Sequence, residues 1–291
     1  MSFKKVTTDS KIGITFSGDL LERLKETEIS ILNDVINICE KNNLRYIAFY
    51  GTLLGTIRHE GFIPWDDDVD ISMPLDDMDS LIKIIKQEYK DKYDVYGLGY
   101  DGFFDPFCAV KISLKNTIFS ELTTLMYPYK RGVSIDIFPA ISCPKGLLKR
   151  RARKFKFSLL THLCSIKFET NKCKLKSKEI SDKRLRRYLR YRRFISHLFF
   201  FLSYERIYKK RIAFYHKKYD SDYLAIDGNG YKNYSFDMSC FTNITLLKFE
   251  NISIKVPVEY DNVLKSLYGT DYMVLPPVEQ REIQKVSEIV L

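Results

Sequence analysis

The 291-residue sequence has few of the features that mark a zinc-binding, secreted or membrane-spanning protein. Its six cysteines form no C-x-x-C pair, and its four histidines do not lie near them in a zinc-binding pattern. The N-terminus carries no apolar signal segment. Apolar runs such as residues 198–202 are far shorter than the roughly 20 residues of a spanning helix. We therefore expect a cytoplasmic protein with reduced thiols.

The composition otherwise suits a folded protein, and the positive charge is concentrated in one part of it. Hydrophobic residues make up 45% of the chain, enough for a core in one large or two small domains. The net charge is +10, yet residues 145–218 alone hold 25 Lys and Arg against four acids, so the remainder is net acidic. No repeat, low-complexity tract or Pro/Ser-rich linker is evident.

The stretch YIAFYGTLLGTIRHEGFIPWDDDVDISM, residues 46–73, gathers most of the residues that suggest chemistry. Its hydrophobic pattern and Gly/Pro positions indicate two strands separated by a short helix and a loop. The expected elements are a strand over 46–50, a helix over 52–58 and a strand over 69–73.

Four aspartates lead into the second of these strands. Strand alternation places Asp66, Asp68 and Asp70 on one face, and Asp67 on the opposite face with Val69. Two carboxylates 4 Å apart repel by roughly 4 kcal/mol at an effective dielectric near 20. Mg²⁺ relieves such repulsion and completes its coordination with waters and substrate phosphate oxygens. We expect Mg²⁺, or Mn²⁺, at Asp68 and Asp70 with Asp66 in support; a solvated acidic loop is the simpler interpretation.

The other end of the stretch offers contacts for an anion. Gly51 and Thr52, at the expected strand-to-helix turn, bring backbone N–H groups and a hydroxyl close to a phosphate. Arg58 and His59 follow one to two turns later, and a guanidinium binds phosphate oxygens bidentately. The sequence thus predicts a phosphate site at these four residues, although a helix cap and a surface histidine are simpler roles for Gly51-Thr52 and His59.

A further carboxylate, Asp136, stands in the apolar run of residues 131–139. That run reads as a central strand, and a carboxylate buried there needs a partner or loses its charge. A structural salt bridge is the simpler role; together with the acidic strand, Asp136 is expected to be a third catalytic and metal-binding carboxylate.

The remaining pattern predicts helices and strands around this unit. Lys115-Asn116 suggests a hairpin turn, with Lys111 on the strand before it and Glu121 on the strand after it. Lys111 is a candidate phosphate contact, with a solvated lysine as the alternative. The expected elements are helices from Ser17 to about Lys41, 76–88 and 260–268, and strands over 107–113, 117–122, 246–249 and 252–256, the last two joined as a hairpin at Glu250-Asn251.

Residues 145–218 interleave Phe and Leu with Lys and Arg, as two or three amphipathic helices would. Such a segment is expected on an anionic membrane surface, where each basic residue contributes about 1 kcal/mol. Nucleic-acid binding competes, but no RNA- or DNA-binding motif accompanies the basic residues, so it is disfavoured. A helical bundle with an ordinary solvated surface is the third interpretation.

These motifs carry a resemblance to a known family. Gly51-Thr52-Leu53-Leu54-Gly55, Arg58-His59 and the run GFIPWDDDVD, which includes Trp65, resemble the signature of the LicD family of phosphocholine transferases of bacterial surface glycans, which are related to fukutin-type transferases. The resemblance implies a nucleotidyltransferase-like fold with a later carboxylate, which Asp136 matches, and it also covers Lys111 and Glu121. PVEYDNVLKSLYGTDYMVLPPVEQR resembles the closing segment of the family, with Tyr260, Tyr268, Asp271 and Arg281 as candidate contacts.

The fold class expected is α+β: a nucleotidyltransferase-like mixed sheet flanked by helices, with a basic amphipathic helical insert. The expected divisions are an arm over 1–16, a catalytic core over 17–144, the insert over 145–218, and a segment over 219–291 that completes the catalytic domain.

The resemblance implies Mg²⁺-dependent transfer of phosphocholine, or another phosphoalcohol, from CDP-choline or another CDP-alcohol to a glycan or lipid-linked oligosaccharide. The protein would then lie on the inner face of the cell membrane. The alternatives are a nucleotidyltransferase acting on a sugar, a small molecule or RNA, and a non-enzymatic membrane-surface adaptor.

Overall fold

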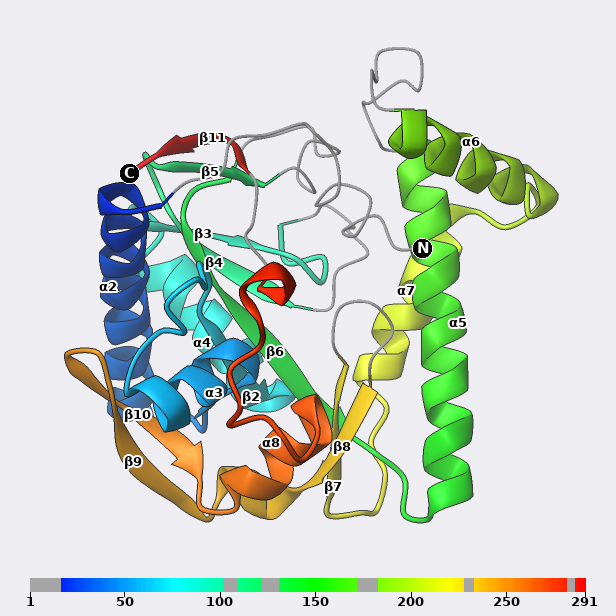
Figure 1. Cartoon of the computed structure of the whole chain (residues 1–291). Coiled ribbons are helices and arrows are strands. Elements are labelled where there is room, and N and C mark those ends of the chain that lie inside the picture. Colours follow the sequence, from blue (N-terminus) through cyan, green and yellow to red (C-terminus); the bar gives the residue numbers. More distant parts are fainter. Residues whose placement is uncertain (1–16, 102–108, 122–130, 172–182, 228–232, 282–285) are drawn as a thin grey trace.

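The computed structural model describes residues 17–101, 109–121, 131–171, 183–227, 233–281 and 286–291. A seven-stranded, curled sheet runs through the protein, with helices packed around it (Figure 1). The sheet has the order β1-β2-β6-β4-β3, and β7 and β8 continue from the far end of β6. Only the β2–β6 pair is parallel within this sheet. The strands are β1 Ile47–Ala48, β2 Asp70–Pro74, β3 Tyr93–Tyr96, β4 Val110–Leu114, β6 Ser134–Ser142, β7 Tyr223–Asp227 and β8 Asn233–Asp237.

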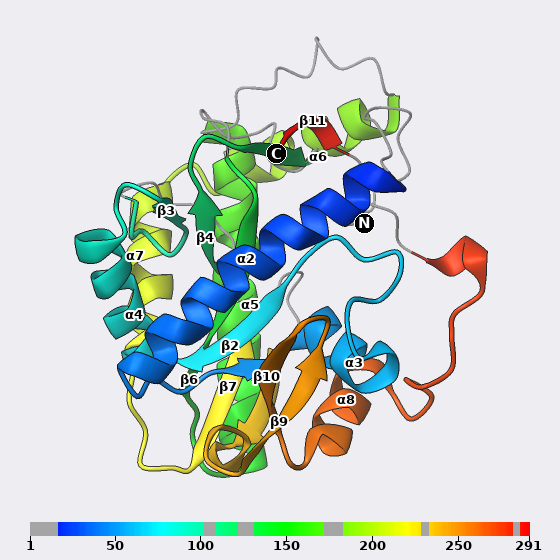
Figure 2. The same cartoon turned by 90° about the vertical axis from the view of Figure 1, so that its left-hand side faces the viewer.

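Two helices, α2 (Asp19–Lys41) and α4 (Leu75–Glu88), pack against β6. The helix predicted to end near Lys41 is present, its apolar side is buried with Ile31 and Val35 fully enclosed, and α2 crosses in front of the sheet in Figure 2. The helix ends where Asn42 donates from Nδ2 to the Ile38 carbonyl. The α+β fold class is therefore confirmed, and the expected arm over 1–16 lies outside the described residues.

The predicted strand–helix–strand unit is present with shifted boundaries. The first strand shrinks to the two residues of β1, and helix α3 (Tyr50–His59) begins earlier than expected. Phe49 is extended, and the helix starts directly at Tyr50, whose φ of 40° turns the chain. Gly51 and Thr52 therefore lie in the first turn of the helix.

The hairpin predicted at Lys115-Asn116 is wrong, although the chain does turn there, with Asn116 at φ 63°. Both edges of β4 are already occupied, by β3 and β6. The next strand, β5 (Ile118–Glu121), instead pairs with β11 (Val286–Val290) at the chain's end. Residues 107 and 108 of the predicted strand lie outside the described residues.

The C-terminal predictions are confirmed. β9 (Ile244–Phe249) and β10 (Ile252–Pro257) form a hairpin, and α8 (Tyr260–Tyr268) follows. Glu250, in the hairpin turn, accepts a hydrogen bond from the Phe62 backbone N–H at 2.9 Å, so the hairpin is tied to the loop that precedes the aspartates. Two short 3-10 turns, η3 (Met238–Phe241) and η4 (Val278–Gln280), complete this part.

The basic segment forms three helices: α5 (Leu147–Asn171), α6 (Lys183–Leu198) and α7 (Tyr204–Tyr215). The chain leaves the sheet after β6 and returns to it at β7, and α5 forms one outer edge of the molecule (Figure 1). Phe157 of α5 packs on Tyr215 of α7, with ring centroids 5.7 Å apart. Across the described ranges, no helix combines the length and apolarity needed to cross a membrane. The domain boundaries remain a prediction.

Gly55 tests the packing of this unit, because a Cβ there would lie 2.3 Å from the Gly61 carbonyl oxygen and 3.2 Å from the Ile63 nitrogen. Both are backbone atoms, which cannot swing aside. Gly55→Ala should lower the free energy of unfolding by about 1–3 kcal/mol in urea titrations, although alanine is the better helix former. The exposed substitution Lys83→Ala should change it by less than about 0.5 kcal/mol. A Gly55→Ala protein as stable as the wild type would contradict this packing.

Candidate active site

Three charged side chains lie in one row across adjacent strands. Asp70 of β2 is paired in register with Asp136 of the parallel strand β6, and Asp136 is paired with Lys111 of the antiparallel strand β4. Side chains at paired positions point to the same face of a sheet. The Lys111 Nζ lies 2.6 Å from an Asp136 Oδ. Two sequence-distant aspartates, predicted separately, are thus brought together with the lysine.

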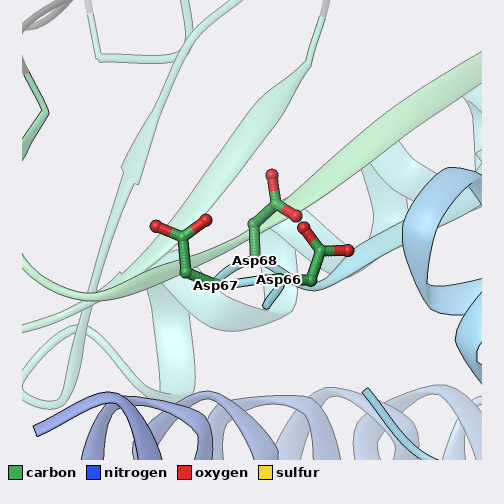
Figure 3. Close-up of side chains that lie close together, drawn as sticks. All are labelled: Asp66, Asp67 and Asp68. Atoms are coloured by element: carbon green, nitrogen blue, oxygen red, sulfur yellow. The ribbon is translucent and has the colours of Figure 1, made fainter. Parts of the chain in front are cut away.

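The aspartate run approaches this row as a loop. β2 begins only at Asp70, so the alternation assumed for Asp66 to Asp68 does not hold. The prediction that Asp67 points away from its neighbours is wrong: Asp66, Asp67 and Asp68 each offer a carboxylate oxygen, and these oxygens lie within 4.8 Å of one another (Figure 3). Strand geometry is absent here because residues 66–68 precede the ladder, in which the Val69 carbonyl accepts from the Asp136 N–H at 2.8 Å.

The electrostatics show that these acids share one field. Burial raises the pKa of Asp70 well above its usual value, and the charges of Asp68, Asp136 and Asp66 raise it further, while Lys111 opposes the shift. The acids near Asp70 thus outnumber the one lysine that opposes the shift. Crowded carboxylate oxygens suit a hard divalent cation such as Mg²⁺, and the described aspartates whose oxygens lie close enough to share one are Asp66, Asp67 and Asp68.

Gly51 and Thr52, in the first turn of α3, contact two of the aspartates. The Thr52 hydroxyl accepts a hydrogen bond from the Asp70 backbone N–H at 2.8 Å, which fixes the start of β2 to α3. A Cβ on Gly51 would lie only 2.5 Å from an Asp66 carboxylate oxygen. Glycine is therefore required for the Asp66 carboxylate to lie against the first turn of α3. The phosphate contact predicted for this pair remains a prediction.

Arg58 and His59 lie at the other end of α3, where Arg58 contacts the C-terminal segment. Arg58 donates from Nε to His59 Nε2 at 3.0 Å and from Nη1 to the Tyr272 carbonyl at 2.8 Å. Burial lowers the pKa of both side chains, and the Arg58 charge lowers that of His59 further. The structure thus shows these two residues binding protein groups, and their phosphate role stays a prediction.

Trp65 and Glu121, two further residues that the resemblance covers, lie in different parts of the structure, and their roles stay predictions. Trp65, beside the aspartates, lies under the guanidinium of Arg281, 4.2 Å from the ring centroid, so the C-terminal segment reaches this loop. Glu121 lies in β5, which belongs to a separate two-stranded sheet, and its side chain lies outside the described residues.

Glu28 of α2 is a site residue that the sequence reasoning missed. It is 2% exposed, and its Oε2 has no hydrogen-bond partner among the described residues. Burial raises its pKa, followed by the charges of Asp68, Asp67 and Asp66. The signal was present in the sequence, because Glu28 falls on the apolar stripe of α2 between Leu24 and Ile31.

Tyr268, at the end of α8, is a candidate of the closing segment that lies within the electrostatic influence of these acids. Burial raises its pKa, and the charges of Asp70, Asp66 and Asp68 raise it further. The residue as a whole remains 44% exposed. Its hydroxyl therefore lies within the field of the carboxylates while part of the side chain faces solvent.

Thr52 tests how the start of β2 is fixed. Thr52→Val removes the acceptor for the buried Asp70 N–H and should lower the free energy of unfolding by about 1–3 kcal/mol in urea. Thr52→Ser keeps the hydroxyl and should recover most of that loss. Thr27→Val, which removes an exposed hydroxyl from α2, is the matched control; an equal loss in both valine variants would contradict the assignment.

The raised pKa of Asp70 predicts how stability depends on pH without metal. The folded state keeps a proton that the unfolded state releases above about pH 3.9, so the free energy of unfolding falls as pH rises from there through the folded-state pKa. Asp70→Asn should flatten this profile and stabilise the metal-free protein at pH 7, by about 1.4 kcal/mol per unit of pKa shift removed.

The control for this experiment is Asp76→Asn, a change to an exposed carboxylate of α4. Melting temperatures in EDTA between pH 4 and 8 give the measurement. The explanation fails if Asp70→Asn is less stable than the wild type at pH 7 while its profile remains as steep.

Comparisons with known proteins agree with this geometry. Residues 43–175 match the family model described as LicD/FKTN/FKRP, nucleotidyltransferase domain, a span that includes β1 to β6 and α5. The chain is 28% identical over 276 residues to the lipopolysaccharide cholinephosphotransferase LicD of Haemophilus influenzae, covering 89% of this chain and 94% of that protein.

Two uncharacterised rickettsial proteins match shorter parts. The protein from Rickettsia prowazekii is 42% identical over 57 residues, 20% of this chain and 21% of its own length. The protein from Rickettsia typhi is 40% identical over 80 residues, 25% of this chain and 26% of its own length. The carboxylate row agrees with these findings: residues 43–175 match the LicD-type nucleotidyltransferase domain, and the chain is similar along most of its length to a LicD protein.

Proposed function

We propose that the protein transfers phosphocholine from CDP-choline to a hydroxyl of a bacterial surface glycan precursor, with Mg²⁺ as cofactor. The observation that carries this proposal is the in-register row of Asp70, Asp136 and Lys111 beside the Asp66–Asp68 loop. The Haemophilus relative, whose name specifies a cholinephosphotransferase acting on lipopolysaccharide, supports the donor group and the acceptor class.

Asp68, Asp70 and Asp136 are the residues that would hold the metal. A bound Mg²⁺ would neutralise the diphosphate of the donor and stabilise charge on the leaving CMP. Phosphoryl-type transfer otherwise demands positioning and charge compensation rather than covalent chemistry by the protein. Lys111, 2.6 Å from Asp136, supplies a fixed positive charge at the end of the row.

The attacking hydroxyl of the acceptor needs a proton acceptor within hydrogen-bond reach. Asp136 is the carboxylate we assign to this step, because it stands in the middle of the row, between Asp70 and Lys111. It would take the proton as the acceptor oxygen attacks the phosphorus that bears choline, and the bond to CMP breaks.

Aromatic side chains near the row suit the choline group. Phe138 lies two residues after Asp136 on β6 and so shares its face of the sheet. Its ring lies 4.9 Å from that of Tyr50, which in turn lies 6.1 Å from that of Tyr234. Aromatic faces attract quaternary ammonium ions; Phe138 is buried, so the partly exposed rings of Tyr50 and Tyr234 are the ones we assign to the choline group. Tyr129, a further aromatic residue in the chain, lies outside the described residues.

A nucleotidyltransferase is the second candidate, because the matched family model describes a nucleotidyltransferase domain. The same carboxylates would then bind a nucleoside triphosphate, and pyrophosphate would leave in place of CMP. The two reactions therefore differ in the product released.

The released product tests the proposal. The protein is incubated with CDP-choline, CDP-glycerol, CDP-ribitol or nucleoside triphosphates, each with a glycan acceptor and with Mg²⁺ or EDTA. We expect CMP from CDP-choline only with Mg²⁺. Asp70→Asn and Asp136→Asn should each lower kcat/KM by about 10²–10³-fold or more, because they remove charge-stabilising ligands. Asp76→Asn should leave it unchanged.

Two outcomes would overturn the proposal. Pyrophosphate released from a nucleoside triphosphate, without CMP from any CDP-alcohol, would establish the nucleotidyltransferase. A non-enzymatic adaptor would be indicated by three results together. Membrane binding would persist in Asp70→Asn and Asp136→Asn, no donor would be turned over, and Mg²⁺ would not change the melting temperature.

A further inference from the structure

Exposed apolar side chains are concentrated on the basic helices. Of seventeen large hydrophobic residues that are exposed in the described part of the chain, nine lie between residues 147 and 201. They are Leu147, Leu148, Phe155, Leu159, Tyr191, Phe194, Leu198, Phe200 and Phe201. Exposed apolar residues gathered in this way mark an interaction surface more often than chance.

On α5 these residues form one stripe that faces away from the rest of the protein. Leu148, Phe155 and Leu159 are spaced by seven and four residues, which puts them on one side of a helix. Phe157, about half a turn from Phe155, packs instead on Tyr215 of α7. Phe155 is consequently 72% exposed, whereas Phe157 is fully buried.

A second stripe of exposed apolar side chains lies on α6. Its members, Tyr191, Phe194 and Leu198, are spaced by three and four residues. The opposite side of α6 binds α5, where Arg192 donates to the Ser165 hydroxyl at 2.7 Å and Lys167 donates to the Ser196 carbonyl at 3.0 Å. The turn after α6 adds two further exposed rings, those of Phe200, which is 82% exposed, and Phe201.

Basic side chains border both stripes. Lys149, Arg151 and Lys156 are exposed on α5, and Arg187 and Arg190 are exposed on α6. In residues 145–218 the basic residues outnumber the acids by 25 to four. Exposed apolar stripes bordered by Lys and Arg match the interface of an anionic bilayer, which accepts the rings and aliphatic chains below its headgroups. RNA would be complementary to the charge but would leave the Leu side chains in water.

We propose that this surface, defined as Leu148, Phe155 and Leu159 of α5 with Tyr191, Phe194, Leu198, Phe200 and Phe201 of α6 and the turn after it, docks the protein on an anionic lipid surface. The proposal goes beyond the transfer reaction, and it holds whatever donor the active site uses. It gives the chain access to a lipid-linked acceptor.

The test is co-sedimentation of the full chain with vesicles of phosphatidylcholine alone or with one quarter phosphatidylglycerol. We expect binding only to the anionic vesicles, weakened by 0.5 M salt. Leu148→Ser/Phe155→Ser should weaken it about tenfold or more, because the buried apolar area is lost. Lys149→Gln and Lys156→Gln should each weaken it about fivefold. The matched controls, Leu246→Ser on β9 and Lys83→Gln on α4, are exposed changes elsewhere and should have no effect.

Three outcomes would overturn the proposal: equal binding to neutral and anionic vesicles, binding that the surface variants do not change, or no vesicle binding with tight binding of a fluorescent RNA. Sedimentation of the free protein as a dimer that Leu148→Ser/Phe155→Ser converts to a monomer would also overturn it, because the surface would then bind a second copy of this chain.

A transfer assay separates this proposal from the proposed function. CMP release from CDP-choline with a water-soluble acceptor should be unaffected in the vesicle-binding variants, so that a failed transferase and a failed docking surface are told apart.

Discussion

Mutual repulsion among carboxylates is the constraint on which the site depends. Asp70 is buried, and the acids that raise its pKa are placed beside it by two different devices, strand register for Asp136 and a loop for Asp66 and Asp68. Such an arrangement lowers stability unless a cation is bound. The surrounding structure tolerates this cost because Thr52 and Gly51 fix the loop and the start of β2 against α3.

Much of the site follows from the sequence because its elements are local. The 46–73 stretch, the isolated Asp136 and the β9–β10 hairpin each depend on near neighbours, and each is found where its pattern indicated. The ion pair of Lys111 with Asp136 fits the same logic, because a carboxylate in an apolar strand needs an opposite charge and β4 lies beside β6.

What the sequence did not yield depends on contacts between distant segments. The partner of β5 is β11, more than 160 residues away, a choice dictated by the occupied edges of β4. Asp67 joins its neighbours because residues 66–68 precede β2, so strand alternation does not set the direction of their side chains. Glu28 was not predicted, although an acid on the apolar face of a helix is itself informative.

The strand β6 connects the carboxylate site to the basic helices. Asp136 stands near its start, and six residues later, about 20 Å away at the rise of a strand, the same element ends and leads into α5. β6 thus joins the end of the sheet that carries Asp136 to the helix that begins the proposed lipid contact. If α5 rests on a bilayer as proposed, its tilt would therefore set the distance of the Asp136 carboxylate from the membrane and its orientation relative to the membrane.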